Sequence, residues 1–363
     1  MRILIVDDSG VTRLLLRSVF EAEGYQVREA SSGAQALKIL EDYTPDIVTM
    51  DVHMPDMDGY ETTARILEKH ALPVVVITAS ADPYATATAM RALEAGALAV
   101  LEKPSGPAAA DFSQRMHEVL QVLQVLRNMA QVKIVRRPRK LEGASGKQHS
   151  VPQLINNTVN NTVNNTPQLV AIAASAGGPV ALKTLLQTLL LPQPWALILV
   201  QHIANGFLLS FRDWLASLSA LPVAVAEEGQ ILTPGVLYLA PDGVHLGFSA
   251  ERRVRLHTGP PEEHLRPSAN YLFRSVAQQF GKQAIGIQLS GMGRDGAQGL
   301  AELYKTGALT LVQEPSSAVI DSMPRAAIDL QAARQVLPPE DIGLLLNLIA
   351  TQLVPPNSLG KRE

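Results

Sequence analysis

Short apolar segments alternate with longer amphipathic segments over the first third of the chain. The apolar segments have the length and composition of buried β-strands, and the amphipathic ones repeat their apolar residues at helical spacing. Strands that alternate with helices in this way predict a parallel sheet that is covered by helices on both faces. We expect strands at residues 2–6, 46–50, 73–78 and 97–101, and helices at residues 11–23, 33–42, 59–69, 83–95 and 111–132.

The same alternation returns in the second half of the chain. It predicts a second doubly wound α/β domain, in which the stretch 223–257 is richer in short β-like runs and is expected to hold an antiparallel insertion. We expect its strands at residues 169–174, 196–201, 236–240, 284–290 and 308–312, and its helices at residues 179–191, 207–219, 268–280, 297–305 and 341–353. The fold class is therefore α/β, with two doubly wound parallel sheets.

A segment of different composition, residues 133–166, separates the two alternating regions. It starts with a cluster of basic residues and ends in a tetrad repeat, Ile-Asn-Asn-Thr from Ile155 followed by two copies of Val-Asn-Asn-Thr. Asparagine and threonine bury too little apolar surface to offset the entropy lost on ordering, which favours a flexible linker. We therefore expect a first domain at residues 1–125, a linker at 126–167 and a second domain at 168–353.

The composition narrows the class of protein. A length of 363 residues and an apolar fraction of 47% suit two domains with separate cores. The net charge of −3 gives no electrostatic basis for binding nucleic acid, and no apolar segment is long enough for direct membrane insertion. The chain has no cysteine, which excludes disulfides and a cysteine nucleophile and is typical of a reducing compartment, so we expect a cytoplasmic protein.

Charged and hydroxyl side chains follow the predicted strands of the first domain. Asp7 and Asp8 come after the first strand, Asp51 ends a later one, and Thr78 and Lys103 follow in the same way. The carboxyl ends of parallel strands lie along one edge of a sheet, so these side chains are expected to gather there. Neighbouring carboxylates repel one another unless a hard cation lies between them, and Mg²⁺ prefers such oxygen ligands. The chemistry that fits is phosphoryl transfer to a carboxylate.

These residues stand in motifs that resemble the receiver domain of two-component response regulators, over about residues 1–125. The motifs are Val6-Asp7-Asp8-Ser9, Met50-Asp51-Val52-His53-Met54-Pro55-Asp56-Met57-Asp58-Gly59, Thr78-Ala79 and Lys103-Pro104. The resemblance implies a flavodoxin-like fold in which a histidine kinase phosphorylates Asp51. It also implies that Asp7, Asp8 and Asp51 bind Mg²⁺ together with the backbone carbonyl of His53.

The same resemblance implies that Thr78 and Lys103 contact the phosphoryl group. Members of the family often carry an aromatic residue three positions before this lysine, whereas this chain has Val100. The resemblance therefore does not tell how the phosphorylation signal would pass through this face.

A candidate nucleophile follows the first strand of the second domain. Ser175 stands between the strand 169–174 and a helix, and Ala176 and Gly177 continue the turn. The glycine permits a tight turn, and the free N–H groups of a helix N-terminus favour negative charge, as an oxyanion hole requires. A phosphate-binding loop has similar features, so this segment by itself favours neither reading.

His202 and Asp295 also follow predicted strands of the second domain. At a common sheet edge, His202 would accept the proton of Ser175 and Asp295 would orient the imidazole, as in a serine hydrolase. Spacing alone does not select these residues over other candidates of the same types. The competing candidates are His245, His257, His264, Asp242 and Asp321.

The second domain resembles the catalytic domain of the CheB-type chemotaxis methylesterases, over about residues 168–350. The motifs are Ala171-Ile172-Ala173-Ala174-Ser175-Ala176-Gly177-Gly178, Gln201-His202-Ile203, Tyr238-Leu239-Ala240-Pro241, Arg266-Pro267-Ser268, Ser290-Gly291-Met292-Gly293-Arg294-Asp295-Gly296 and Met323-Pro324-Arg325. The resemblance implies a Rossmann-like domain in which Ser175 is the nucleophile, His202 the general base and Asp295 the orienting acid, with Met292 lining the site. The family usually has threonine at Ala176, whose backbone N–H would still serve as an oxyanion contact.

The two resemblances together imply a chemotaxis response regulator. Phosphorylation of Asp51 would release a catalytic edge that the receiver covers, and the enzyme would hydrolyse glutamate γ-methyl esters and deamidate glutamines on methyl-accepting chemoreceptors. The hydrolysis would need no cofactor. Two alternatives stay open: a receiver joined to a non-catalytic anion- or partner-binding module, and a methylesterase-like enzyme of a pathway other than chemotaxis.

Overall fold

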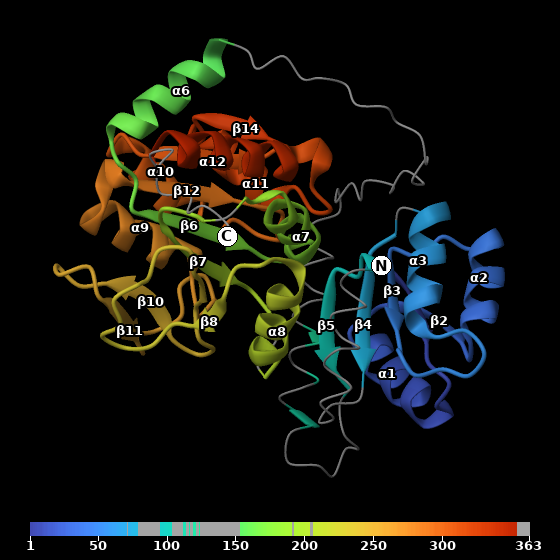
Figure 1. The fold of residues 1–363 in the computed structure, drawn as a ribbon. Coiled ribbons are helices and arrows are strands. Elements are labelled where there is room, and N and C mark those ends of the chain that lie inside the picture. The colour runs from blue at the N-terminus through green and yellow to red at the C-terminus, as the bar shows by residue number, and fades with distance from the viewer. Residues whose placement is uncertain are drawn as a thin grey trace, which may run out of the picture. The chain divides into compact units, whose positions relative to one another are not determined.

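The chain divides into two compact units, Met1–Glu142 and Gly143–Glu363 (Figure 1). The computed structural model describes residues 1–70, 72–78, 95–103, a few positions between 112 and 123, 153–190, 192–203 and 206–353. The helices expected at 83–95 and 111–132 lie almost entirely outside these residues. None of the described helices combines the length and the apolar character that crossing a bilayer requires.

The first unit is built on a five-stranded parallel sheet with the strand order β2-β1-β3-β4-β5. Its strands are β1 (Arg2–Val6), β2 (Gln26–Ala30), β3 (Ile47–Met50), β4 (Val74–Thr78) and β5 (Ala99–Glu102), and its described helices are α1 (Gly10–Ala22), α2 (Gly33–Asp42) and α3 (Gly59–Lys69). Each of these helices begins after a side-chain cap, which Ser9, Ser32 and Asp58 provide by accepting a backbone N–H of the first turn. The doubly wound parallel sheet predicted for this half is confirmed.

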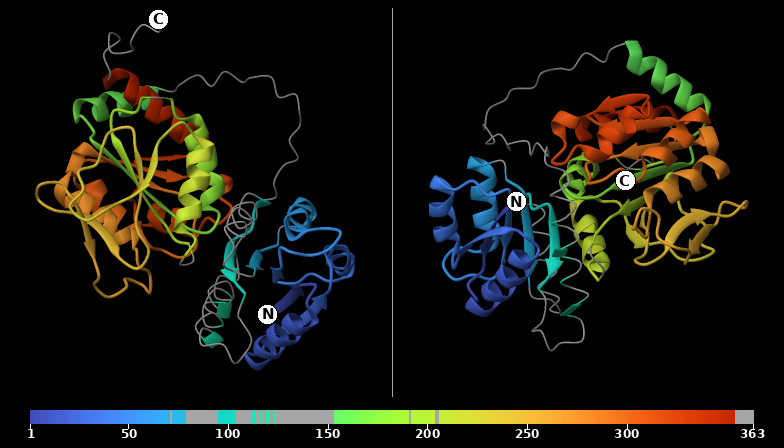
Figure 2. Two further views of the ribbon diagram at one scale, coloured as in Figure 1. Left: turned by 60° about the horizontal axis from the view of Figure 1, so that its bottom comes forward. Right: turned by 180° about the vertical axis from the view of Figure 1, so that it is seen from behind.

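The second unit contains a seven-stranded parallel sheet with the order β14-β13-β12-β6-β7-β9-β8. Its strands are β6 (Leu169–Ala174), β7 (Ala196–Gln201), β8 (Val223–Val225), β9 (Leu237–Leu239), β12 (Ala284–Gln288), β13 (Leu309–Gln313) and β14 (Gln335–Leu337). Its helices are α6 (Gln153–Asn164), α7 (Gly178–Thr188), α8 (Leu208–Leu218), α9 (Ala269–Gln279), α10 (Ala297–Lys305), α11 (Ser322–Asp329) and α12 (Pro339–Leu353). Helices α7 and α12 pack together on one face and α9 and α10 on the other, as the views of Figure 2 show. The predicted α/β class is confirmed here too.

The segment 223–257 is only partly the antiparallel insertion that its composition predicts. Strands β10 (His245–Phe248) and β11 (Val254–His257) form an antiparallel hairpin of their own. Strands β8 and β9, in contrast, join the main sheet in parallel. Every residue of β9 is buried, so this short strand extends the core of the sheet.

Helix α6 corrects the prediction of a flexible linker over its residues. The tetrad repeat advances by nearly one helical turn per copy, so Val159 and Thr162 lie on one buried face of α6, with 3% and 6% of their surfaces exposed. The helix packs on α12, and Gln335 Nε2 donates a hydrogen bond to Thr158 Oγ1 at 3.1 Å. The repeat therefore forms part of the second unit, while the predicted domain limits themselves stay a prediction.

Candidate functional site

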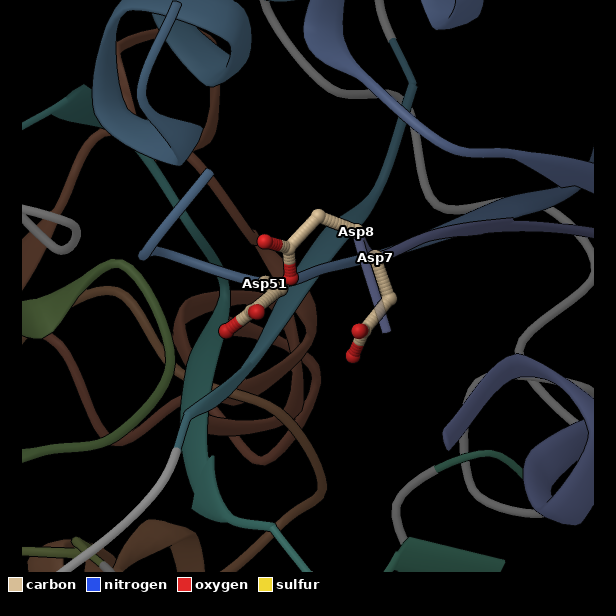
Figure 3. A group of neighbouring side chains, drawn as sticks. All are labelled: Asp7, Asp8 and Asp51. Atoms are coloured by element: carbon tan, nitrogen blue, oxygen red, sulfur yellow. The ribbon is translucent and has the colours of Figure 1, made fainter. Parts of the chain in front are cut away.

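Three acidic residues of the first unit, Asp7, Asp8 and Asp51, meet at the carboxyl edge of its sheet (Figure 3). Val6 of β1 pairs with Met50 of β3, so Asp7 and Asp51 are the next residues on two neighbouring strands. Carboxylate oxygens of Asp7, Asp8 and Asp51 lie within 4.8 Å of one another. Asp7 and Asp51 are buried whereas Asp8 is exposed, which leaves the cluster one open side.

Lys103 joins the two buried carboxylates. Its Nζ lies 2.8 Å from Asp7 Oδ2 and 2.9 Å from Asp51 Oδ2. Burial raises the pKa of the Asp7 carboxyl and the charge of Asp51 adds to this, and Lys103 only partly offsets them. Burial acts to lower the pKa of Lys103, but its contacts with Asp7 and Asp51 outweigh this and hold that pKa above the usual value. The site thus carries more negative charge than one lysine balances.

This cluster fits a small divalent cation. The carboxylates supply hard oxygen ligands, and the excess negative charge is what an ion would neutralise. Gly59 lies so close to the backbone of Asp51 that a Cβ would meet the Asp51 carbonyl oxygen at 2.0 Å, so the chain beside the site requires glycine. His53 follows at an exposed position and Val100 is buried in β5. Thr78 ends β4, and its side chain lies outside the described residues.

The candidate nucleophile lies at the carboxyl edge of the second sheet. Ala174 of β6 pairs with Gln201 of β7, so Ser175 and His202 are again the next residues on two neighbouring strands. The backbone N–H of His202 donates to the Ala174 carbonyl at 3.0 Å, and Gln201 Nε2 donates to the Ser175 carbonyl at 2.9 Å. Ser290 follows the end of β12, and its carbonyl oxygen accepts the N–H of Ser175 at 3.1 Å. Three strand ends therefore fix the backbone of Ser175.

The turn that follows Ser175 is held by close backbone packing. Gly177 caps α7 with a φ of +76°, and a Cβ there would lie 2.6 Å from Ser290 Oγ. Ser290 Oγ in turn donates to the carbonyl of Ala176 at 3.1 Å, which fixes the peptide of this half-buried residue. Gly291 also approaches closely, because a Cβ on it would meet Ser175 Cβ at 2.8 Å. The predicted tight turn into a helix is confirmed.

His202 and Asp295 are brought together. His202 Nε2 lies 3.0 Å from Asp295 Oδ2, although the imidazole N–H is not aligned with the carboxylate as in a hydrogen bond. The side chain of Asp295 is 1% exposed and that of His202 11%. No hydrogen bond joins the Ser175 hydroxyl to His202 within the described part of the chain. Met292, which was expected to line the site, is half-buried in the loop before Asp295.

Asp295 is surrounded by hydrogen-bond donors at the N-terminus of α9. Its carboxylate accepts the N–H groups of Ala269 (2.6 Å), Asn270 (2.9 Å) and Gly296 (2.9 Å), and the hydroxyl of Ser268 at 2.8 Å. Burial acts to raise the pKa of Asp295, but the His202 imidazole and these N–H groups outweigh it, so the pKa lies below the ordinary value. The carboxylate is thereby kept ionised and fixed beside the imidazole.

Asp295 is also linked to a second serine, Ser268, and through it to a second histidine, His245. The backbone N–H of Ser268 donates to His245 Nδ1 at 3.2 Å, while the Ser268 hydroxyl binds Asp295. Ser268, His245 and Asp295 thus form a network that the expected triad does not include. The sequence gives a signal for Ser268 alone, which stands at the start of the predicted helix 268–280, where an N-cap serine would, and gives none for the link to His245.

The other competing candidates lie in different settings. Asp321 pairs with the exposed Arg325 at 2.7 Å, and Asp242 accepts the N–H of Gly206 at 3.2 Å. His257 and His264 are exposed. Of the candidate aspartates Asp242, Asp295 and Asp321, Asp295 is therefore the one in contact with His202.

Comparisons with known proteins agree with both halves of the chain. The family model of the CheB methylesterase matches residues 170–346, and that of the response regulator receiver domain matches residues 3–111. "Protein-glutamate methylesterase/protein-glutamine glutaminase 3" of Hahella chejuensis is 45% identical over 353 residues, which cover 97% of this chain and 99% of the relative. A protein of that name, numbered 1, from Syntrophus aciditrophicus is 39% identical over 98% of this chain and all of its own length.

A solved structure is also similar. The CheB methylesterase catalytic domain of Thermotoga maritima is 31% identical, and the match covers 52% of this chain and 99% of that chain with a TM-score of 0.49. The near-complete coverage of the curated relatives, together with the two family models, places both domains in one established combination. The chain belongs to the CheB methylesterase family, as a member with an N-terminal response regulator receiver domain.

Proposed function

We propose that this protein hydrolyses the γ-methyl esters of glutamate residues, and deamidates glutamine residues, with Ser175, His202 and Asp295 as its catalytic triad. The single observation that carries the assignment is the 3.0 Å contact of His202 with Asp295. His202 itself lies next to Ser175, because the residues before them, Gln201 and Ala174, are paired in neighbouring strands. The curated relatives that match along the whole chain carry the name of this enzyme activity.

The mechanism follows from where each group lies. Ser175 attacks the ester carbonyl while His202 accepts its proton, and because Nε2 faces Asp295, Nδ1 is the nitrogen left for this transfer. The oxyanion receives the backbone N–H of Ala176, because at the start of α7 the N–H of Gly178 already donates to the Ser175 carbonyl at 2.8 Å and Pro179 has none. Methanol leaves, or ammonia for a glutamine, after taking the proton from His202. Water that His202 activates then releases the glutamate and frees Ser175.

Ser268 is the competing nucleophile, and its setting argues against that role. Its side chain has no exposed surface, and its hydroxyl is already bound to Asp295 and caps α9. His245 contacts the backbone N–H of Ser268 and not its hydroxyl, which faces the carboxylates of Asp295 and Glu262 but no imidazole in this network. Ser175, in contrast, keeps 8% of its surface exposed before the start of α7, and its hydroxyl makes no hydrogen bond with another residue in the described part of the chain.

The receiver supplies the control of this activity in our proposal. Asp51 accepts a phosphoryl group from a histidine kinase, and Asp7, Asp8 and Asp51 would hold a Mg²⁺ ion, which would supply positive charge to offset the negative charge gathered there. Lys103, already 2.9 Å from Asp51 Oδ2, then contacts the phosphoryl oxygens. Phosphorylation raises the hydrolytic rate, and the substrates are cytoplasmic segments of methyl-accepting chemoreceptors, which makes this a cytoplasmic chemotaxis enzyme.

Methanol release from methylated chemoreceptor membranes tests the proposal. The full chain is compared with Ser175→Ala, Ser268→Ala and Asp51→Asn, each with and without a small-molecule phosphodonor. We expect Ser175→Ala to abolish release, Ser268→Ala to retain part of it, and Asp51→Asn to lose only the response to the phosphodonor.

Retained turnover in Ser175→Ala with loss in Ser268→Ala would transfer the nucleophile to Ser268. If the unaltered chain releases no methanol from receptor membranes but hydrolyses the methyl ester of another protein, it is an enzyme of a different pathway. Phosphorylation of Asp51 without hydrolysis of any protein ester would support a non-catalytic second domain. For removal of the receiver, the shortened chain should begin before Gln153, because α6 packs on α12.

A further inference from the structure

We infer that His245 and Ser268 are positioning residues for the catalytic aspartate, so that a second histidine sets the geometry of the triad without touching substrate. The inference rests on the proposed role of Asp295. Both side chains are fully or almost fully buried, and they form a chain of hydrogen bonds in which His245 binds the backbone of Ser268 and the Ser268 hydroxyl binds Asp295.

The partners of His245 define its protonation state. Nδ1 accepts the N–H of Ser268 at 3.2 Å, so this nitrogen carries no hydrogen. Nε2 lies 3.0 Å from the carbonyl oxygen of Pro260, which can only accept, so Nε2 carries the hydrogen and donates it. His245 is therefore a neutral imidazole with both nitrogens satisfied, and it ties two separate backbone segments together.

Ser268 passes this constraint to Asp295. With its backbone held by His245, its hydroxyl donates to Asp295 Oδ1 at 2.8 Å and accepts the N–H of Tyr271 at 3.3 Å as the cap of α9. Ala269 and Asn270, the next residues of the same turn, donate their N–H groups to the same carboxylate. A shift of Ser268 would therefore move three of the donors that orient Asp295.

The surroundings of His245 keep its ring in place. It is 1% exposed and stacks on Tyr271, with ring centroids 4.8 Å apart and an angle of 18° between the planes. His257 stacks on the same tyrosine at 5.9 Å and is paired with His245 across β10 and β11, but it is exposed. Among the residues that the structure describes, His257 hydrogen-bonds within its own turn, where its Nδ1 accepts the N–H of Gly259, so it is a matched control of the same residue type.

The test separates the hydrogen-bond acceptor from the ring. His245→Asn places an amide oxygen near the position of Nδ1, where it accepts the Ser268 N–H, but loses the stacking and the donor to Pro260. His245→Phe keeps an aromatic ring on Tyr271 and has no acceptor. If positioning is the role, activity follows the acceptor, whereas the stability of the fold follows the ring.

The full chain with each substitution is assayed for kcat and KM of methanol release from methylated receptor membranes, with the phosphodonor present. We expect kcat to fall about 10- to 100-fold in His245→Phe with KM unchanged, since a small displacement of an orienting group is costly but substrate contacts remain. His245→Asn should recover most of kcat while unfolding more readily, and His257→Phe should leave both constants unchanged. Ser268→Thr, which keeps the hydroxyl, should be far more active than Ser268→Ala.

Two results would overturn the inference: a normal kcat in His245→Phe, or a loss in His245→Asn that is as large as in His245→Phe. Either would reduce His245 to a packing residue. Ser175→Ala is measured alongside, because turnover that survives this change rejects the proposed triad itself. A dead Ser175→Ala with a fully active His245→Phe rejects only the positioning role.

Discussion

Both units bury carboxylates at the carboxyl edge of a parallel sheet, but they surround them differently. Asp7 and Asp51 lie beside a further carboxylate with one shared ammonium, that of Lys103. Asp295 accepts bonds from three backbone N–H groups and a hydroxyl. Burial raises the pKa of Asp7 to a value above the ordinary one, whereas the His202 imidazole, together with the N–H groups of Asn270 and Ala269, outweighs burial and lowers the pKa of Asp295.

The difference matches the two kinds of chemistry. A cluster with unbalanced negative charge is ready to take up a cation, and with it the phosphoryl group whose charge that cation offsets. A carboxylate that the fold itself satisfies can stay ionised without any ion and act on a neighbouring imidazole. The same residue type at the same place in the fold is thus prepared for different partners by the number of donors around it.

Substitution of Asp295 should have the largest effect. In Asp295→Asn the group beside His202 loses its charge and an amide N–H faces the donors of α9, so we expect kcat for methanol release to fall about 10⁴-fold. Phosphorylation of Asp51 should proceed at its normal rate in this variant, measured by incorporation from a labelled small phosphodonor. Asp213→Asn is the control, because the side chain of Asp213 is 67% exposed. Activity close to that of the unaltered chain would show that Asp295 does not act on His202.

Substitution of Lys103 tests the other side of the comparison. Lys103→Met leaves the buried Asp7 and Asp51 without their shared cation, which should cost about 3–5 kcal/mol of receiver stability when Mg²⁺ is absent. Added Mg²⁺ should restore part of this, because it neutralises the same carboxylates. Hydrogen exchange of peptides from β1 and β3 measures the effect, with the exposed Lys38→Met as control. Equal losses with and without Mg²⁺ would contradict an ion site at this cluster.

The accuracy with which the sequence predicts an element depends on the kind of element. Buried strands such as β6 and β7 were predicted to the residue, because an unbroken apolar run before a turn has few other readings. The edge strands β2, β8 and β14 were not predicted as separate strands, since their residues are partly exposed and β8 and β14 have three residues each. The prediction of a flexible linker is wrong over α6, because the polar composition of this segment hides the four-residue spacing of Val159 and its equivalents, which suits a helix.

The sites show the same limit. His202 and Asp295 were expected together because each follows a strand, and the structure brings them into contact. Ser268 and His245 were not assigned a role, because their link to Asp295 runs through a backbone N–H that no residue pattern encodes. Strand ends can therefore be read from sequence, whereas the support behind a catalytic group depends on loops whose paths only the fold defines.

The dependence of stability on pH should show the smallest effect of the three, and it differs in sign between the sites. The pKa of Asp295 is lowered by folding, so its ionised form stabilises the second unit above the pKa of the unfolded chain, and protonation removes this as pH falls through the folded value. Asp295→Asn should therefore cost about 2 kcal/mol near neutral pH and progressively less below about pH 4. Urea unfolding followed by Trp195 and Trp214 measures this in the full chain, because both of its tryptophans lie in the second unit.

The receiver supplies the opposite case for the same measurement series. Because the pKa of Asp7 is raised, its ionised form opposes folding, and Asp7→Asn should stabilise the Mg²⁺-free receiver at neutral pH and lose that advantage on acidification. Hydrogen exchange of β1 peptides is the measure, since tryptophan fluorescence does not report on the first unit. If both substitutions changed stability with the same sign across this range, the number of surrounding donors would not be what distinguishes the two carboxylates.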